Sequence, residues 1–463
     1  MNHSLLTLLS GLLLLGPLAA RAQQAPPPGA APRPFVLPAR TSFVLPNGLK
    51  TQLVPYGRLP KVTVSLVLQT GNVHEQATEP GLADIVGTLL SEGSPAVPAA
   101  ALATQVARMG GTLDVAVGET ETTLSGTVLA EHGPAFVALL GQLVQQPALP
   151  AEALPRVRAD LKRRLALFGA RPATQARLAY AGALFGNHPY GRGLPTDAQL
   201  EAYTIEQVRA FYAREYGARR ASLYVVGRCD TAAVRRATVT ALRDWTPGPE
   251  RRIAVPQPQA RGQLLVLDRP GAQQTSVVMG LPVVPPSHPD YAGLRVMNAL
   301  LGGSMSARIP RNIRGAKGYT YGSVSGIYPR YGYADWGEGT DVASEHTADA
   351  LREIFAEITR LQEEAPPVQE LRDVQGQEAG QFVLRNSSPA GIITQLRFLD
   401  LHGLPDAYLA AQVPAVYTIT PQQVQALARQ YLRPEAMTVV LVGDRAALTG
   451  QLQGFQVQGR RLW

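Results

Sequence analysis

The chain has 463 residues, 45% of them hydrophobic, and its 43 lysines and arginines exceed its 35 acidic residues, which gives a formal net charge of +8. A chain of this length buries more than one hydrophobic core, so we expect two domains. Its single cysteine, Cys229, excludes an internal disulfide. The positive charge favours acidic partners or acidic peptides, whereas no module that interleaves basic and aromatic residues is present, which argues against nucleic-acid binding.

Residues 1–22 are interpreted as a secretory signal peptide. Leu5–Leu18 form an apolar stretch and Ala20-Arg21-Ala22 matches the small-x-small cleavage pattern, although no lysine or arginine precedes the stretch. Residues 23–34 are rich in proline and predict an extended tether. No segment offers the roughly 18 continuous apolar residues of a membrane span. We therefore expect an exported protein, periplasmic or extracellular, without stable membrane insertion.

Residues 35–245 are predicted to form a first domain in which strands and helices alternate. An alternating strand is expected at Val62–Leu68. Residues 81–94 carry apolar side chains at i, i+3, i+4, i+7 and i+8, starting from Leu82. This spacing predicts an amphipathic helix that faces a core and ends near Gly93. A later helix is expected at Arg156–Phe168.

A proline- and glycine-rich linker at residues 246–262 separates this domain from a second one at residues 263–463. The two parts repeat one another loosely. The sequence Tyr-Thr-Ile at Tyr203 returns at Tyr417, and each copy precedes a helix and then an apolar strand. A repeat of this length indicates duplicated domains rather than a solenoid. We predict an α+β fold of two homologous sandwich domains, each a mostly antiparallel sheet packed with helices.

Residues 300–322 contain a glycine turn, then Ser-x-Arg, then Arg-x-x-x-Gly-x-x-Tyr, in which the arginine is Arg314 and the last tyrosine is Tyr321. Gly302-Gly303 is not followed by Gly-Lys-Ser/Thr, so a nucleotide-binding loop is not indicated. Taken alone, Arg314 is an ordinary surface arginine and Tyr321 a strand residue that packs on the sheet. An ordinary structural role and a functional role of this pair both stay open at this point.

The order of these features resembles the pitrilysin/insulinase family of zinc peptidases, in its half-length bacterial form. The resemblance runs from about Phe35 to the C-terminus. It rests on Leu45-Pro-Asn-Gly-Leu49, the strand and helix that follow, His188-Pro-Tyr-Gly191, and the pattern at residues 300–322. It implies a chain of two α/β domains that form half of a peptide-degrading chamber.

In that family the first helix carries the zinc motif H-x-x-E-H, in which two histidines bind the metal and the glutamate activates water. At these positions the present chain has Asp84, Gly87 and Thr88. The family's third ligand, a glutamate, comes from the later helix, where our alignment places Arg164. One carboxylate beside a cationic run does not make a zinc site, so we expect this chain to bind no metal.

The resemblance also implies a role for Arg314 and Tyr321. In family members that retain the pair, both residues hydrogen-bond substrate and help to stabilise the oxyanion that forms when water attacks the peptide. Arginine and tyrosine suit this task because both stay protonated at neutral pH.

Three functional hypotheses follow. The first is a non-catalytic subunit of a heterodimeric peptidase, in which a homologous partner supplies H-x-x-E-H and zinc, while this chain supplies Arg314, Tyr321 and half of the chamber wall. The second is an inert peptide-binding or structural scaffold of the same fold. The third is a self-sufficient metallopeptidase with unconventional ligands centred on Asp84, Glu92 or His74.

Overall fold

The computed structural model describes residues 35–250, 253–457 and 460–461. The predicted signal peptide and tether, residues 1–22 and 23–34, lie outside this range. Among the residues described, no helix combines the length and the apolar character that a membrane span requires.

The first half of the chain forms a six-stranded sheet in the order β1-β2-β8-β3-β7-β6. Its strands are β1 (Thr41–Val44), β2 (Lys50–Pro55), β3 (Lys61–Leu68), β6 (Asp114–Val117), β7 (Thr122–Leu129) and β8 (Ala221–Gly227), with a small ribbon of β4 (Gly93–Ser94) and β5 (Val97–Pro98). Its helices are α2 (Leu82–Leu90), α3 (Ala99–Arg108), α4 (Gly133–Gln145), α5 (Leu154–Gly169), α6 (Pro172–Phe185), α7 (Asp197–Ala202), α8 (Ile205–Glu215) and α9 (Thr231–Leu242).

The second half forms a five-stranded sheet in the order β11-β12-β10-β13-β9. Its strands are β9 (Gln263–Asp268), β10 (Gln274–Val283), β11 (Thr320–Arg330), β12 (Tyr333–Ala343) and β13 (Thr438–Gly443), with a ribbon of β14 (Gln456–Val457) and β15 (Arg460–Arg461). Its helices are α10 (Tyr291–Leu301), α11 (Arg308–Pro310), the π-helix η7 (Arg311–Ala316), α12 (Thr347–Glu363), α13 (Val368–Arg385), α14 (Pro389–His402), α15 (Ala407–Thr418), α16 (Pro421–Tyr431) and α17 (Arg445–Leu452).

The two sheets share one topology, which confirms the duplication predicted from the sequence. Read from its other edge, the second sheet runs β9-β13-β10-β12-β11 and matches β2-β8-β3-β7-β6 of the first. In both, one pair is parallel, β2 with β8 and β9 with β13, and the remaining matched pairs are antiparallel. Equivalent helices follow both Tyr-Thr-Ile copies, but with an offset of two residues: Thr204, inside the first copy, caps α8, whereas Thr420, just after the second copy, caps α16, each in a capping box.

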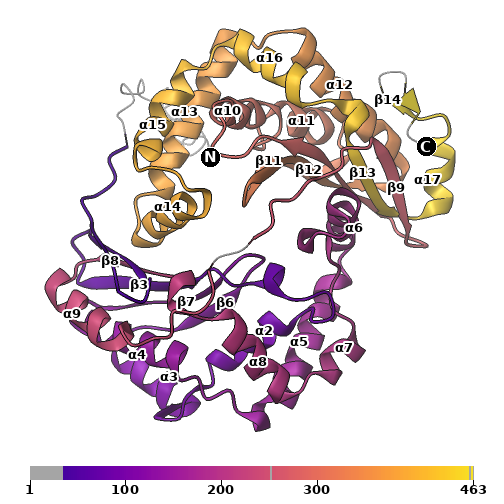
Figure 1. Ribbon diagram of the computed structural model, residues 1–463. Coiled ribbons are helices and arrows are strands. Elements are labelled where there is room, and N and C mark those ends of the chain that lie inside the picture. Colours follow the sequence, from indigo (N-terminus) through magenta and orange to yellow (C-terminus); the bar gives the residue numbers. More distant parts are fainter. Residues whose placement is uncertain (1–34, 251–252, 458–459, 462–463) are drawn as a thin grey trace, which may run out of the picture. The chain divides into compact units, whose positions relative to one another are not determined.

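Each sheet buries one face under the helices of its own half. Leu82, Ile85, Val86, Leu89 and Leu90 of α2 are all buried in the first core, as the sequence spacing predicted. The second core collects α10, α12 and α16 on the equivalent face of the second sheet. Helices on a mostly antiparallel sheet are the predicted α+β architecture (Figure 1).

The other face of each sheet is buried by a helix from the other half of the chain (Figure 1). Helix α6 of the first half packs on the second sheet, where Tyr180 and Phe185 contact Tyr333. Helix α14 of the second half packs on the first sheet, where Leu396 joins Val67 in one cluster. Because α14 covers the second face of the first sheet, β3, which was expected as an alternating strand, is buried on both faces.

Polar contacts accompany the exchanged helices. Arg397 of α14 forms an ion pair with Glu121 in the turn between β6 and β7. Arg330 at the end of β11 binds Glu119 in the same turn, with Nε–Oε2 and Nη2–Oε1 distances of 2.9 and 3.2 Å. Asp400 of α14 accepts a hydrogen bond from the Gln52 side chain of β2 at 3.1 Å. The two halves therefore share both apolar and charged contacts.

The exchange predicts that the halves unfold together. We expect Leu396→Ala, which opens a cavity between α14 and the first sheet, to lower the free energy of unfolding by about 2–5 kcal/mol. Urea unfolding of two single-tryptophan versions, one retaining Trp245 and one Trp336, should report the same loss from each half. Leu167→Ala, which truncates a leucine that is 72% exposed, is the control. If only one of the two tryptophans reported a lower free energy of unfolding, the halves would not unfold together.

Candidate functional site

Helix α2 places the degenerate zinc motif against α5 and the edge strand β6. The helix begins after Gly81, whose φ of 85° lies in the left-handed region that glycine adopts without strain. It ends at Leu90, three residues before the predicted stop at Gly93. The apolar face of α2 is buried, so the motif positions lie beside the contacts with α5 and β6 rather than inside the main core.

Asp84 and Arg164, which the sequence places on separate helices, lie next to each other. Arg164 Nη2 is 3.7 Å from Asp84 Oδ1, and the Asn72 side-chain amide donates to Asp84 Oδ2 at 2.8 Å. The side chain of Arg164 is largely exposed, whereas that of Asp84 is mostly buried. A guanidinium therefore lies against the carboxylate where the family would bring two metal ligands together.

The two remaining motif positions cannot supply a general base or a second ligand. A Cβ atom on Gly87 would overlap the Cγ2 methyl group of Val117 on β6. The place of a side chain at position 87 is thus filled by a valine from the neighbouring strand. The Thr88 hydroxyl donates to the Asp84 carbonyl oxygen at 2.8 Å and so is engaged with its own helix.

A second carboxylate, Glu75, lies close to Asp84. The Asn72 amide also reaches Glu75 Oε1 at 3.3 Å, and the Ala83 backbone N–H donates to the same oxygen at 2.9 Å. Burial raises the pKa of Glu75 to about 7, which its hydrogen bonds oppose and the nearby Asp84 reinforces. Burial also raises the pKa of Asp84, against the opposing effects of Asn72 and Arg164.

These residues do not fit a zinc ion. Within residues 35–250, 253–457 and 460–461, no three histidine, cysteine, aspartate or glutamate side chains gather as a metal site requires. The carboxylates that are present are occupied by an amide, a backbone N–H and a guanidinium. The positive charge beside Asp84 is the guanidinium of Arg164.

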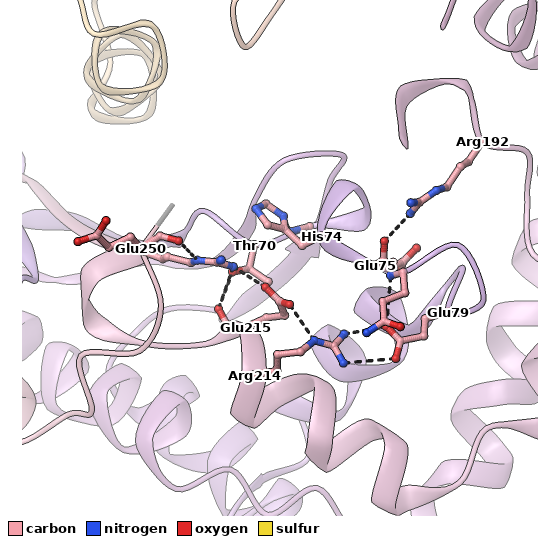
Figure 2. A network of polar contacts seen from close by, with 11 residues as sticks. Thr70, His74, Glu75, Glu79, Arg192, Arg214, Glu215 and Glu250 are labelled. Atoms are coloured by element: carbon pink, nitrogen blue, oxygen red, sulfur yellow. Dashed lines mark hydrogen bonds and ion pairs between the residues drawn. The ribbon is translucent and has the colours of Figure 1, made fainter. Parts of the chain in front are cut away.

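Charged residues of α8 hold the segment that connects β3 to α2 (Figure 2). Arg214 donates to both carboxylate oxygens of Glu79, at 3.3 and 2.7 Å, and to Glu215 at 2.9 Å. Arg192 donates to the Glu75 carbonyl oxygen at 2.7 Å. This network explains why Glu75 remains next to Asp84 despite the cost of burying two carboxylates.

The unconventional ligands named by the third hypothesis do not gather around Asp84. His74 accepts a hydrogen bond at Nδ1 from the Gly71 backbone N–H, at 3.0 Å. Glu92 forms an ion pair with Arg156, at 2.5 Å. Because the described residues include no metal-binding group built from these side chains, the geometry gives no support to that hypothesis.

Arg314 and Tyr321 lie side by side on the second half. Arg314 is on the π-helix η7, and its Cζ atom is 5.7 Å from the centroid of the Tyr321 ring on β11. Tyr321 is 89% exposed. Within the described parts of the chain, neither the guanidinium nor the phenol hydroxyl has a hydrogen bond or ion pair. The pair therefore presents unused donors, and Tyr321 does not pack on the sheet.

Three residues of this region, Asn72, Glu75 and Val117, were not predicted from the sequence. Asn72 and Glu75 belong to a polar turn before α2, where amide and acidic residues are common and carry no signal of burial. Val117 lies 30 residues beyond Gly87 and meets it only through the packing of β6 on α2. A glycine inside a predicted helix was the one available hint, because it often marks a close approach.

Comparisons with protein families match both halves of the chain. The model described as Insulinase (Peptidase family M16) matches residues 57–196, and the model described as Peptidase M16 inactive domain matches residues 202–378. An uncharacterized zinc protease of Mycobacterium tuberculosis is 24% identical over 436 residues, which cover 92% of this chain and 98% of that protein. One from Streptomyces coelicolor is 23% identical over 425 residues, covering 87% and 90%.

Solved structures share the fold. A peptidase M16 inactive domain from Pseudomonas fluorescens has a TM-score of 0.79 and 23% identity, covering 88% of this chain and 98% of that one. A protease from Helicobacter pylori has a TM-score of 0.81 and 17% identity, covering 88% and 100%. The first half of the periplasmic protease PqqL from Escherichia coli has a TM-score of 0.72 and 15% identity, covering 90% and 95%.

The close approach of Val117 predicts that the family's glutamate cannot simply be restored. Gly87→Glu should lower the free energy of unfolding by about 3 kcal/mol or more, because it forces a charged side chain into filled space. Adding Val117→Ala should recover part of this loss. Gly376→Glu, at an exposed position of α13 where an added Cβ would meet open space, is the matched control and should cost little. Equal stability of the two glutamate variants in thermal unfolding would contradict the account.

The environment of Glu75 predicts a specific pH dependence. Its pKa rises from 4.5 to about 7 on folding, so the folded state binds the proton more tightly. Stability is therefore lost as the pH rises from about 4.5 to about 7. Glu75→Gln should remove this loss. The free energy of unfolding of the variant, relative to that of the wild type, should therefore rise by about 2–3 kcal/mol between pH 5 and pH 8. Urea unfolding across this range measures the difference, and the exposed Glu152→Gln serves as control. A difference that is constant with pH would refute the assignment.

Proposed function

Since the chain belongs to the pitrilysin/insulinase family, we propose that it is the non-catalytic subunit of a heterodimeric zinc metallopeptidase. A homologous partner would supply the H-x-x-E-H motif and zinc, and this chain would supply Arg314, Tyr321 and half of the chamber that encloses the peptide. The proposal includes export of the chain, to the periplasm or beyond, as the N-terminal sequence predicts.

The observation that carries this proposal is the contrast between the two sites of the chain. At the motif positions of α2, Asp84 is paired with Arg164 and the place of the catalytic glutamate is filled by Val117. Arg314 on η7 and Tyr321 at the start of β11 are adjacent, exposed and free of protein acceptors within the described residues. A chain that lacks a metal site but presents unused donors is expected if a second chain supplies the metal and this one supplies the donors.

The chemistry that these donors can perform is stabilisation of negative charge. A guanidinium offers five N–H donors in a fixed plane, and a phenol offers one O–H. When both groups donate to a peptide carbonyl, their hydrogen bonds strengthen as the oxygen becomes an oxyanion. The donors therefore bind the transition state better than the substrate. The stacking of Arg314 over the Tyr321 ring keeps the two donors on one side of the chain.

A peptide-binding scaffold is the second candidate, because the same free donors can hold a peptide backbone without cleaving it. The net charge of +8 favours acidic peptides in either case. The zinc protease relatives and the M16 inactive domain among the solved structures favour the subunit over the scaffold.

The test is substitution of the pair in the assembled heterodimer. Arg314→Ala and Tyr321→Phe should each lower turnover of a fluorogenic peptide by about 10²-fold, the scale of one lost oxyanion donor. Arg372→Ala and Tyr417→Phe, exposed residues of the same types on α13 and α15, are matched controls and should leave turnover unchanged. Unaltered turnover in both test variants would rule out the transition-state role.

A further inference from the structure

Strand β11 contains a bulge at the point from which Tyr321 projects. Thr320 pairs with Val342 of β12, but the next pair is Ser323 with Thr340. Between these two pairs β11 advances three residues and β12 advances two, which leaves one extra residue in β11. A bulge re-aims the side chains beside it, and here Tyr321 points into solvent at 89% exposure while Thr320 is buried.

Two buried threonine hydroxyls close this bulge. Thr320 Oγ1 accepts from the Gly322 backbone N–H at 3.1 Å and lies 2.6 Å from the Asp341 carbonyl oxygen, to which it donates. Thr340 Oγ1 lies 2.9 Å from both Thr320 Oγ1 and the Gly322 carbonyl oxygen. The N–H and C=O of Gly322, which a bulge would otherwise leave unpaired, are therefore both bound by side chains.

The segment that carries Arg314 is held separately. Ile313 is fully buried, and its carbonyl oxygen accepts from the Tyr319 backbone N–H at 2.8 Å. The Asn312 side chain donates to Glu353 and Glu357 of α12, each at 2.9 Å. The position of Arg314 is thus set by its own helix, by α12 and by the Tyr319 N–H, none of which involves the hydroxyls of the bulge, whereas Tyr321 lies inside the bulge.

We propose that Thr320 is the positioning residue of Tyr321: its buried hydroxyl closes the β11 bulge and holds the phenol beside Arg314. This inference rests on the proposed function, in which the two donors act on the peptide together. The benefit is preorganisation, because a donor already aimed at the developing oxyanion does not have to be ordered during the reaction. Thr320 itself does not touch the substrate.

The test removes the hydroxyl without changing the shape of the side chain. In the assembled heterodimer, Thr320→Val should lower kcat about tenfold with little change in KM, and Thr320→Ser, which keeps the hydroxyl, should stay within about twofold of wild type. Thr347→Val removes another buried hydroxyl of the second half, one bonded to Thr275 and Ser344, and controls for general destabilisation. Thr340→Val provides a second route to the same bulge if Thr320→Val folds poorly.

A double-mutant cycle distinguishes positioning from a structural role. If Thr320 acts through Tyr321, Thr320→Val causes no further loss of kcat in the Tyr321→Phe background. A tenfold loss in both backgrounds, or wild-type kcat in Thr320→Val when Tyr321→Phe alone is slow, would overturn the inference.

A readout on the single chain separates this inference from the proposed function. The ¹⁹F NMR signal of 3-fluorotyrosine at position 321 should change in Thr320→Val but not in Thr347→Val. An unchanged signal overturns the positioning role. An altered signal together with full activity of Tyr321→Phe supports the positioning role and removes the proposed function instead.

Discussion

The structure depends on the burial of the second face of each sheet by a helix from the opposite half of the chain. Without α6 and α14, apolar residues such as Val67 on the first sheet and Val440 on the second would be exposed to water. The exchange also fixes the turn between β6 and β7, whose Glu119 and Glu121 are bound by Arg330 and Arg397. That turn follows the strand whose Val117 packs against Gly87. The motif region of the first half is thus coupled to residues of the second.

The replaced zinc motif is an integrated part of the packing rather than an empty site. Metal ions in such sites join the helices that carry their ligands, and here the ion pair of Asp84 with Arg164 joins α2 to α5. The Asn72 amide links Asp84 to Glu75, and the Arg214 network holds the segment around them. A single substitution back toward the family motif at Gly87 meets space that is filled by Val117. The two donors to which we assign a function, Arg314 and Tyr321, lie instead on the second half, on η7 and at the start of β11.

Much of the fold followed from local patterns. The apolar spacing in α2 predicted its buried face, the Tyr-Thr-Ile repeats marked equivalent helices, and the resemblance placed Asp84 and Arg164 at corresponding ligand positions on two helices that prove to be in contact. What could not be predicted depends on contacts between distant segments. The burial of β3 on both faces requires α14, some 330 residues away in the chain, and the filling of the space at Gly87 requires β6. The only local signal of the bulge at Thr320 is Gly322, because a glycine inside a strand often marks a bulge; the threonine hydroxyls that close it depend on pairing with β12.

The most direct measurement is the zinc content and peptide hydrolysis of the purified chain, alone and after mixing with a homologous chain from the same source that carries H-x-x-E-H. The account predicts no stoichiometric zinc and no hydrolysis for the chain alone, and hydrolysis by the mixture well above that of the partner alone. Stoichiometric zinc with activity in the isolated chain would contradict the interpretation of Asp84, Gly87, Thr88 and Arg164. A mixture no more active than the partner alone would contradict the subunit role and leave the peptide-binding scaffold.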